Sequence, residues 1–224
     1  MFGKNPIRKP ALGDGLSLDV VEIFSTLQGE GPNVGHPSVF IRLGGCNLAC
    51  DFCDTEFENF SAQPLDDIIK QIDATSCEGE KRVRHLVVIT GGEPMRQPIV
   101  RLCEALIADG FTVQIETNGT LYQPLPAAVE IICSPKASNG AYFPVRDDIL
   151  MRANALKFII SADESPYDSV PDVGQKTYKT PVYVQPMDSY DKARNEANMR
   201  HALALAQTHG YRLSLQIHKW LGIA

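Results

Sequence analysis

The hydrophobic positions of the chain first stand out as short, unbroken apolar runs. Residues 86–89 and 182–184, for example, consist only of aliphatic or aromatic side chains. Such runs are typical of strands that are buried on both faces of a sheet. After a first apolar stretch at 20–24, we predict strands at residues 38–44, 85–90, 111–116, 130–133, 155–160, 181–185 and 213–217.

Between these runs, apolar residues recur at the three- and four-residue spacing of a helix. In residues 64–74, Leu65, Ile68 and Ile72 share one face, and Pro64 suits the first position of a helix. Glycines at positions 110 and 210 are suitable helix ends. We therefore predict helices at 64–74, 96–109 and 192–209.

The alternation of strands and helices predicts an α/β protein with a mostly parallel sheet and right-handed crossovers. Residues 134–154 show no clear helical pattern, and residues 164–180 have the character of a loop. A closed eightfold βα barrel typically takes about 250 residues and eight helices. We therefore expect a partial, open βα barrel that forms a single domain over residues 1–224.

The composition of the chain indicates which kinds of binding partner and which cellular compartment are expected. Hydrophobic residues make up 44% of the chain and charged residues 21%, which is ordinary for a soluble globular protein. The formal net charge of −6 and the lack of a basic run argue against nucleic acid as the main partner. Neither a membrane span nor a secretory signal is visible. We expect a cytoplasmic protein whose six cysteines are reduced.

Three of these cysteines, Cys46, Cys50 and Cys53, lie within eight residues directly after a predicted strand. Three thiolates on one short loop can hold three irons of a cubane cluster and leave the fourth iron open to a ligand. The alternative is a structural zinc site in a non-catalytic module. Closed zinc sites need four ligands, and His36 and His85 are isolated in the sequence. The remaining cysteines are expected to pack as small apolar side chains.

Two motifs together resemble the radical S-adenosylmethionine (SAM) superfamily. The first is the cysteine triplet itself, with Phe52 before its last cysteine, and the second is Thr90-Gly91-Gly92-Glu93-Pro94 after an apolar strand. The resemblance implies a [4Fe–4S] cluster on the three cysteines, with SAM bound to its open iron. It also implies the partial βα barrel of the radical SAM type.

Segments along the rest of the chain are similar to the 7-carboxy-7-deazaguanine synthase family within that superfamily. They run from about residue 20 to the end and include residues 23–32, 35–42, 53–55, 116–119, 134–136, 185–188 and 216–220. The family converts 6-carboxy-5,6,7,8-tetrahydropterin to 7-carboxy-7-deazaguanine with loss of ammonia, on the route to queuosine. The resemblance further implies Mg²⁺, a homodimer and an electron donor such as a flavodoxin. A glycyl-radical-enzyme activase is the nearest alternative enzyme.

The resemblance also assigns site residues, many of which follow predicted strands, where barrel-type sites collect. Arg42 suits a carboxylate as a bidentate partner, although a surface salt bridge is an equally open reading of the residue alone. Thr55 is the implied Mg²⁺ ligand, with Asp54 as its rival. The implied substrate-binding residues are Leu27, Gln28, Gly29, Glu30, Arg42, Thr90, His218 and Ala224. The implied SAM-binding residues are Phe52, Gly92, Glu93, Glu116, Ser134, Pro135, Lys136, Gln185, Pro186, Met187 and Asp188.

Overall fold

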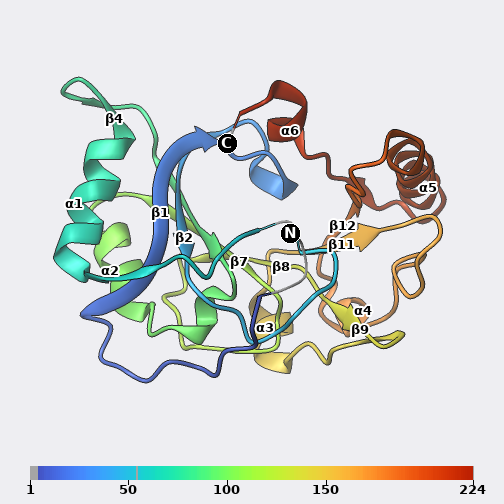
Figure 1. Ribbon diagram of the computed structural model, residues 1–224, viewed down its shortest axis with the longest axis horizontal. Coiled ribbons are helices and arrows are strands. Elements are labelled where there is room, and N and C mark those ends of the chain that lie inside the picture. Colours follow the sequence, from blue (N-terminus) through green and yellow to red (C-terminus); the bar gives the residue numbers. More distant parts are fainter. Residues whose placement is uncertain (1–4, 54, 224) are drawn as a thin grey trace.

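A computed structural model describes residues 5–53 and 55–223, and its main feature is one nine-stranded sheet (Figure 1). Asp54 and Ala224 lie outside the described residues. The strand order is β13-β12-β11-β8-β7-β6-β2-β1-β3, so β13 and β3 are open edges. The strands are β1 (Ser17–Leu27), β2 (Pro37–Leu43), β3 (Ser61–Pro64), β6 (Leu86–Gly91), β7 (Thr112–Thr117), β8 (Glu130–Cys133), β11 (Ala155–Ile160), β12 (Val182–Pro186) and β13 (Arg212–Leu213).

From β2 to β13 every neighbouring pair of strands is parallel, whereas β1 is antiparallel to both β2 and β3. The carboxyl ends of the parallel strands are in register, as in the pairs Leu43–Gly91 and Thr117–Cys133. The predicted mostly parallel, open arrangement is therefore confirmed. Segments that follow these strands in the sequence meet at one edge of the sheet.

Helices pack against the sheet and complete the core. They are α1 (Leu65–Ser76), α2 (Val100–Ala108), α3 (Asp147–Arg152), α4 (Gln175–Tyr178), α5 (Lys192–His209) and α6 (Ile217–Leu221). Helix α1 contacts β1, α2 contacts β7 and α5 contacts β12. Two short hairpins, β4–β5 (Cys77–Glu78 and Lys81–Arg82) and β9–β10 (Ala137–Ser138 and Ala141–Tyr142), stand apart from the main sheet. Among the helices described, none has the length and apolar character needed to cross a membrane.

Most predicted elements agree with the structure, and the differences have local causes. Helix α2 begins later than predicted, at Val100, because Pro94–Arg96 forms a separate 3-10 turn and Gln97 is extended, with φ −107° and ψ 155°. A residue before proline is driven to this conformation, and Pro98 follows Gln97.

The last predicted strand, at 213–217, is wrong beyond Leu213. The backbone N–H of Ser214 still bonds to β12, but Ile217 opens α6 and donates its N–H to the carbonyl of Gly29. Helix α3 and the short helix α4 were not predicted from the sequence. Helix α3 has only six residues, of which Ile149 and Leu150 are buried, so it presents too short a pattern to identify.

Candidate active site on one face of the sheet

A cavity of about 430 Å³ lies against one face of the sheet. Its wall combines side chains that alternate along strands, such as Phe40 and Arg42 on β2 and Lys157 and Ile159 on β11. Side chains two residues apart on a strand share a face. The segments that follow β1, β2, β6, β8 and β12 complete the wall, so most of the chain contributes to one site.

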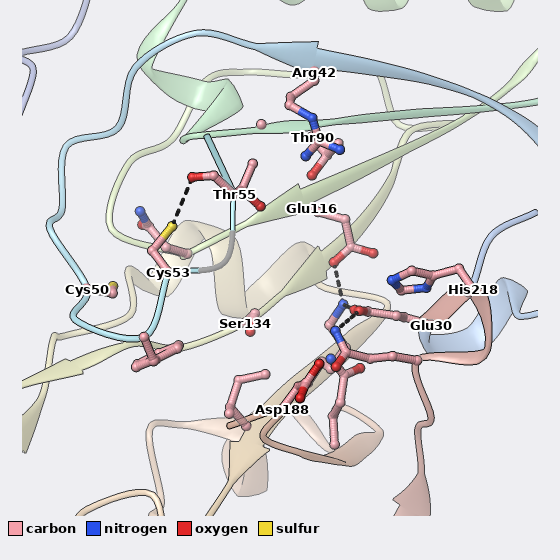
Figure 2. A pocket seen from close by; sticks show the side chains of 18 of the residues that line it. Glu30, Arg42, Cys50, Cys53, Thr55, Thr90, Glu116, Ser134, Asp188 and His218 are labelled. Atoms are coloured by element: carbon pink, nitrogen blue, oxygen red, sulfur yellow. Dashed lines mark hydrogen bonds and ion pairs between the residues drawn. The ribbon is translucent and has the colours of Figure 1, made fainter. Parts of the chain in front are cut away.

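Cys46, Cys50 and Cys53 all line this cavity from the loop that follows β2 (Figure 2). The start of the loop is fixed by its backbone: Gly45 donates its N–H to Phe57, and the carbonyl of Cys46 accepts the N–H of Arg8. Gly45 has φ +75°, which favours glycine. The backbone therefore aims the three thiols into the cavity.

The donor set fits an iron–sulfur cluster better than a single zinc ion. All six cysteines are reduced thiols. Among residues 5–53 and 55–223, no three His, Cys, Asp or Glu side chains converge closely enough to hold one metal ion. In a cubane each thiolate binds a different iron, so three spread thiols on one loop suit it. Burial raises the pKa of Cys46 to about 12, so this thiol ionises only when a metal compensates its charge.

The other cysteines lie outside the cavity wall. Cys103 and Cys133 are fully buried in the hydrophobic core, as expected for cysteines that pack as small apolar side chains, and Cys77 is partly buried.

Glu93 was expected to bind SAM, but the structure places its carboxylate behind the cavity wall. Glu93 is fully buried and is not among the residues that line the cavity. One oxygen, Oε1, accepts the N–H of Met95 at 3.0 Å and the hydroxyl of Thr117 at 2.8 Å. The other, Oε2, accepts the N–H of Asn118 at 2.7 Å. The Glu93 side chain therefore organises the protein around it.

Asn118 extends this contact to the cluster loop. Its amide donates to Oδ1 of Asn47, between the first two cluster cysteines, at 3.0 Å. Asn47 in turn donates to the hydroxyl of Thr120 at 2.8 Å. The close approach also depends on Gly92, because a Cβ there would lie 2.0 Å from the carbonyl oxygen of Gly45. The glycine motif and the cysteine loop are thus packed backbone to backbone.

Gln28 and Glu30 line another part of the wall. Gln28 is 2% exposed, and its Nε2 has no hydrogen-bond partner among the described residues. Its Oε1 accepts the N–H of Glu30 at 3.0 Å, which fixes the amide orientation. A buried N–H group without a partner is costly, so Gln28 is suited to donate to a ligand.

Glu30 belongs to a charged network with Lys157 and Glu116, in which the lysine is buried and both carboxylates are partly buried (Figure 2). Nζ of Lys157 lies 2.5 Å from Glu30 and 2.9 Å from Glu116. Burial by itself would raise the pKa of Glu30, but attraction to Lys157, with hydrogen bonds from Lys157 and Gln216, lowers it to about 2. Glu30 therefore presents an ionised carboxylate to the cavity.

Arg42 and Thr90 are neighbours in the β2–β6 register and both line the cavity. Nε of Arg42 forms an ion pair with the half-exposed Glu22 at 2.7 Å, and its guanidinium lies 5.6 Å from the centroid of the Phe24 ring. The structure thus combines both readings of Arg42, a surface salt bridge on one side and a cavity wall on the other. Thr55 also lines the cavity, and its carbonyl accepts the side-chain N–H of Asn5.

The predicted SAM-binding residues mostly line the cavity. They are Phe52, Gly92, Glu116, Ser134, Lys136, Gln185, Pro186, Met187 and Asp188. Lys136 donates to the carbonyl and hydroxyl of Ser134, at 2.8 and 2.6 Å. Pro135 is not part of the wall, since Ser134 turns inward beside it. Ala224, predicted to contact substrate, lies outside the described residues.

The segment around α6 closes the cavity from the C-terminal side. Gln216 donates to Oε1 of Glu30 at 2.8 Å, and Lys219 forms an ion pair with Asp188 at 3.0 Å. His218 packs on Gly29, where a Cβ would lie 2.0 Å from its Nδ1. These contacts join the end of β1 to the end of β12.

Several wall residues escaped the sequence analysis, chiefly Lys157, Asn118, Gln216 and Lys219. Lys157 had a usable signal, because it is the charged residue within the apolar strand β11. Lysine is rarely buried without a partner. The other three lie in the family-like segments 116–119 and 216–220, but nothing in the sequence indicates that their side chains line the cavity.

Comparison with known proteins agrees with this geometry. A model of the radical SAM superfamily matches residues 40–135. A 7-carboxy-7-deazaguanine synthase of Rickettsia prowazekii is 54% identical over 224 residues, which cover all of this chain and 96% of that protein. The corresponding protein of Rhodospirillum rubrum is 42% identical, and the alignment covers both chains completely.

The chain belongs to the 7-carboxy-7-deazaguanine synthase family. The crystal structure of QueE from Escherichia coli has a TM-score of 0.70 and 28% identity to this chain, and the match covers 89% of this chain and 94% of that one. Membership of the superfamily implies a [4Fe–4S] cluster and SAM as cofactors. The chain is therefore a radical SAM lyase, and neither a glycyl-radical-enzyme activase nor a zinc-binding module is favoured.

Proposed function

We propose that this chain converts 6-carboxy-5,6,7,8-tetrahydropterin to 7-carboxy-7-deazaguanine with release of ammonia. One observation carries the proposal: a three-thiol loop opens into the same cavity as Gln28, whose buried Nε2 lacks a partner among the described residues, and the ionised Glu30. A pterin has carbonyl and N–H groups along one edge. Gln28 supplies the donor for the carbonyl, and Glu30 supplies the acceptor for N–H groups.

The substrate carboxylate needs a cationic partner at a distance from Glu30, because two carboxylates repel each other. Arg42 lies on β2, which β6, β7 and β8 separate from Lys157 on β11. A guanidinium binds a carboxylate through paired hydrogen bonds. With Glu30 at one side and Arg42 at the other, the cavity would bind the flat heterocycle in a single orientation, with Thr90 and His218 beside it.

The cluster on Cys46, Cys50 and Cys53, together with SAM, supplies the adenosyl radical that starts the chemistry. The chain's own contribution is to bind, orient and shield. Gln185 and Asp188 at the end of β12, with Ser134 and Lys136 after β8, offer polar groups for SAM. The α6 segment forms part of the cavity wall through Gln216, His218 and Lys219.

We assign Mg²⁺ to Thr55, which lines the cavity two residues after the last cluster cysteine. Magnesium prefers oxygen ligands and retains several waters, so one hydroxyl together with substrate oxygens is a sufficient set. Thr55→Val keeps the side-chain shape and removes the hydroxyl. We expect it to abolish stimulation of turnover by Mg²⁺, and unchanged stimulation would contradict the assignment.

We further propose that the protein is a cytoplasmic homodimer that receives electrons from a small donor protein such as a flavodoxin. These proposals rest on the family resemblance, and the net charge of −6 speaks against nucleic acid as a partner. Analytical ultracentrifugation tests the dimer, and a sedimentation coefficient of a monomer at micromolar concentration would contradict it.

The substrate assignment can be tested by binding, without turnover. The oxidised analogue 6-carboxypterin and unsubstituted pterin would be titrated into cluster-loaded protein with SAM. The wild type should prefer the carboxylated ligand. Arg42→Met should lose this preference, whereas Glu22→Gln, which removes only the outer partner of Arg42, should keep it. Equal affinity of the wild type for both ligands would contradict the proposal.

A further inference from the structure

Lys157 is a charged residue in the interior of the sheet. Its neighbours on β11, Leu156 and Phe158, are fully buried, and Lys157 itself is 4% exposed. Its ammonium lies between Glu30, which follows β1, and Glu116, on β7. One side chain thus connects the predicted substrate side of the cavity to the predicted SAM side.

Each carboxylate is also held from a second direction. Oε1 of Glu30 accepts the amide of Gln216 at 2.8 Å, and Oε1 of Glu116 accepts the amide of Gln114 at 2.8 Å. Gln114 is fully buried and its own Oε1 accepts the amide of Asn33 at 2.7 Å. Both carboxylates therefore have one oxygen on Lys157 and the other on a glutamine, and both residues line the cavity.

The charge balance of this network depends on one group. Two carboxylates whose side chains are 17% and 16% exposed share a single ammonium, and without that cation their mutual repulsion disfavours the doubly charged state. Burial would lower the pKa of Lys157, but the nearby Glu116 and Glu30 raise it, so the lysine stays charged. Of the other charged groups nearby, His218 also faces Glu30, and Lys219 is paired with Asp188.

We propose that Lys157 is a positioning residue that holds the carboxylates of Glu30 and Glu116 in place and keeps Glu30 charged, so that the two serve as hydrogen-bond acceptors for substrate and for SAM. The assignment of the two ligands rests on the proposed function. The arrangement also determines ligand orientation, because the net negative charge of the trio repels the substrate carboxylate towards Arg42. Neither ligand needs to contact Lys157 itself.

The first test needs no ligand. Thermal unfolding of cluster-loaded wild type and Lys157→Met would be compared between pH 6 and pH 8. Without Lys157, Glu30 loses the ammonium that lowers its pKa, and desolvation then raises that pKa. Folding is therefore favoured while Glu30 is protonated and disfavoured as pH rises. We expect the deficit in melting temperature to grow by about 3–5 °C per pH unit.

Glu116→Gln is the matched control, since it removes a charge from the same network and leaves Lys157 paired with Glu30 alone. Its difference from the wild type should stay constant over this pH range. Lys157→Gln, which retains hydrogen-bond donors without the charge, should show the same pH slope as Lys157→Met and replaces it if the methionine variant does not fold. A deficit independent of pH in the lysine variant would overturn the proposal and indicate a packing role.

The second test measures the acceptor itself. For 6-carboxypterin, the dissociation constant of Lys157→Met would be divided by that of the wild type at each pH. This ratio should be about tenfold larger at pH 6 than at pH 8, because protonated Glu30 no longer accepts a hydrogen bond from the ligand. Taking the ratio cancels the titration of the free ligand. A ratio that does not change with pH would overturn the proposal. If the wild type binds no analogue, the proposed function fails, and the unfolding comparison alone decides the role of Lys157.

Discussion

The buried carboxylate of Glu93 gives the sharpest test of how the site is built. Glu93→Gln keeps the size of the side chain but replaces one oxygen with an NH₂ group. If the remaining oxygen serves Met95 and Thr117, the N–H of Asn118, now 2.7 Å from Oε2, meets a donor instead of an acceptor. Leaving one buried donor unsatisfied costs about 2 kcal/mol.

For a chain of this length, that cost corresponds to a melting temperature lowered by about 4–8 °C. Glu93→Ala removes both acceptor oxygens, and with them all three hydrogen bonds, and should cost about 4 kcal/mol. The assay is thermal unfolding of the protein without cofactors, with the exposed Glu104→Gln on α2 as control, for which we expect no change.

Equilibrium binding of SAM to the cluster-loaded variant completes the assay. A Glu93→Gln protein with the melting temperature of the wild type but a large loss of SAM affinity would refute this reasoning. That result would return Glu93 to the role of a direct SAM ligand. We expect the reverse order, with stability falling most and affinity changing only through the position of Asn118.

Three further predictions follow from the same geometry. Cys50→Ser should lose iron and sulfide while keeping the far-ultraviolet circular dichroism of the wild type. Cys103→Ser, which changes a core cysteine outside the cavity, should keep the cluster. Normal iron content in Cys50→Ser would contradict the cluster assignment. Gly29→Ala should displace the α6 segment and speed hydrogen exchange of the Ile217 amide, which bonds to the carbonyl of residue 29; unchanged exchange would contradict this packing. Because the pKa of Glu30 is lowered from 4.5 to about 2, its ion pair stabilises the fold fully above pH 4.5 and is lost as pH falls towards 2. Urea unfolding of wild type and Glu30→Gln should therefore converge over that range, and a constant difference would show that the pair contributes nothing.

The strands of the sheet could be predicted closely because burial on both faces demands apolar residues. Strands β8 and β11 have the predicted bounds, and so does helix α5, which ends at Gly210. The ends of helices were harder to predict where they depend on backbone geometry. The start of α2 is set by the extended residue before Pro98, and α6 begins where the chain turns to reach Gly29.

The motifs predicted which segments meet in the cavity but not which atoms face it. Glu93 and Pro135 belong to the right motifs, yet their side chains lie outside the wall. Contacts between distant segments, such as Gln216 with Glu30, leave no local pattern in the sequence. The contacts of Lys157 are the exception, because a single charged residue in an apolar strand indicates an oppositely charged partner nearby.

The central claim is that the three-thiol loop and the polar cavity act on one carboxylated pterin. It is tested most directly by incubating anaerobically reconstituted protein with SAM, a reductant and 6-carboxy-5,6,7,8-tetrahydropterin, and analysing the products by mass spectrometry. We predict 7-carboxy-7-deazaguanine and an equal amount of ammonia. Formation of 5′-deoxyadenosine without any deazaguanine would contradict the claim about the substrate, while leaving the cluster and its use of SAM in place.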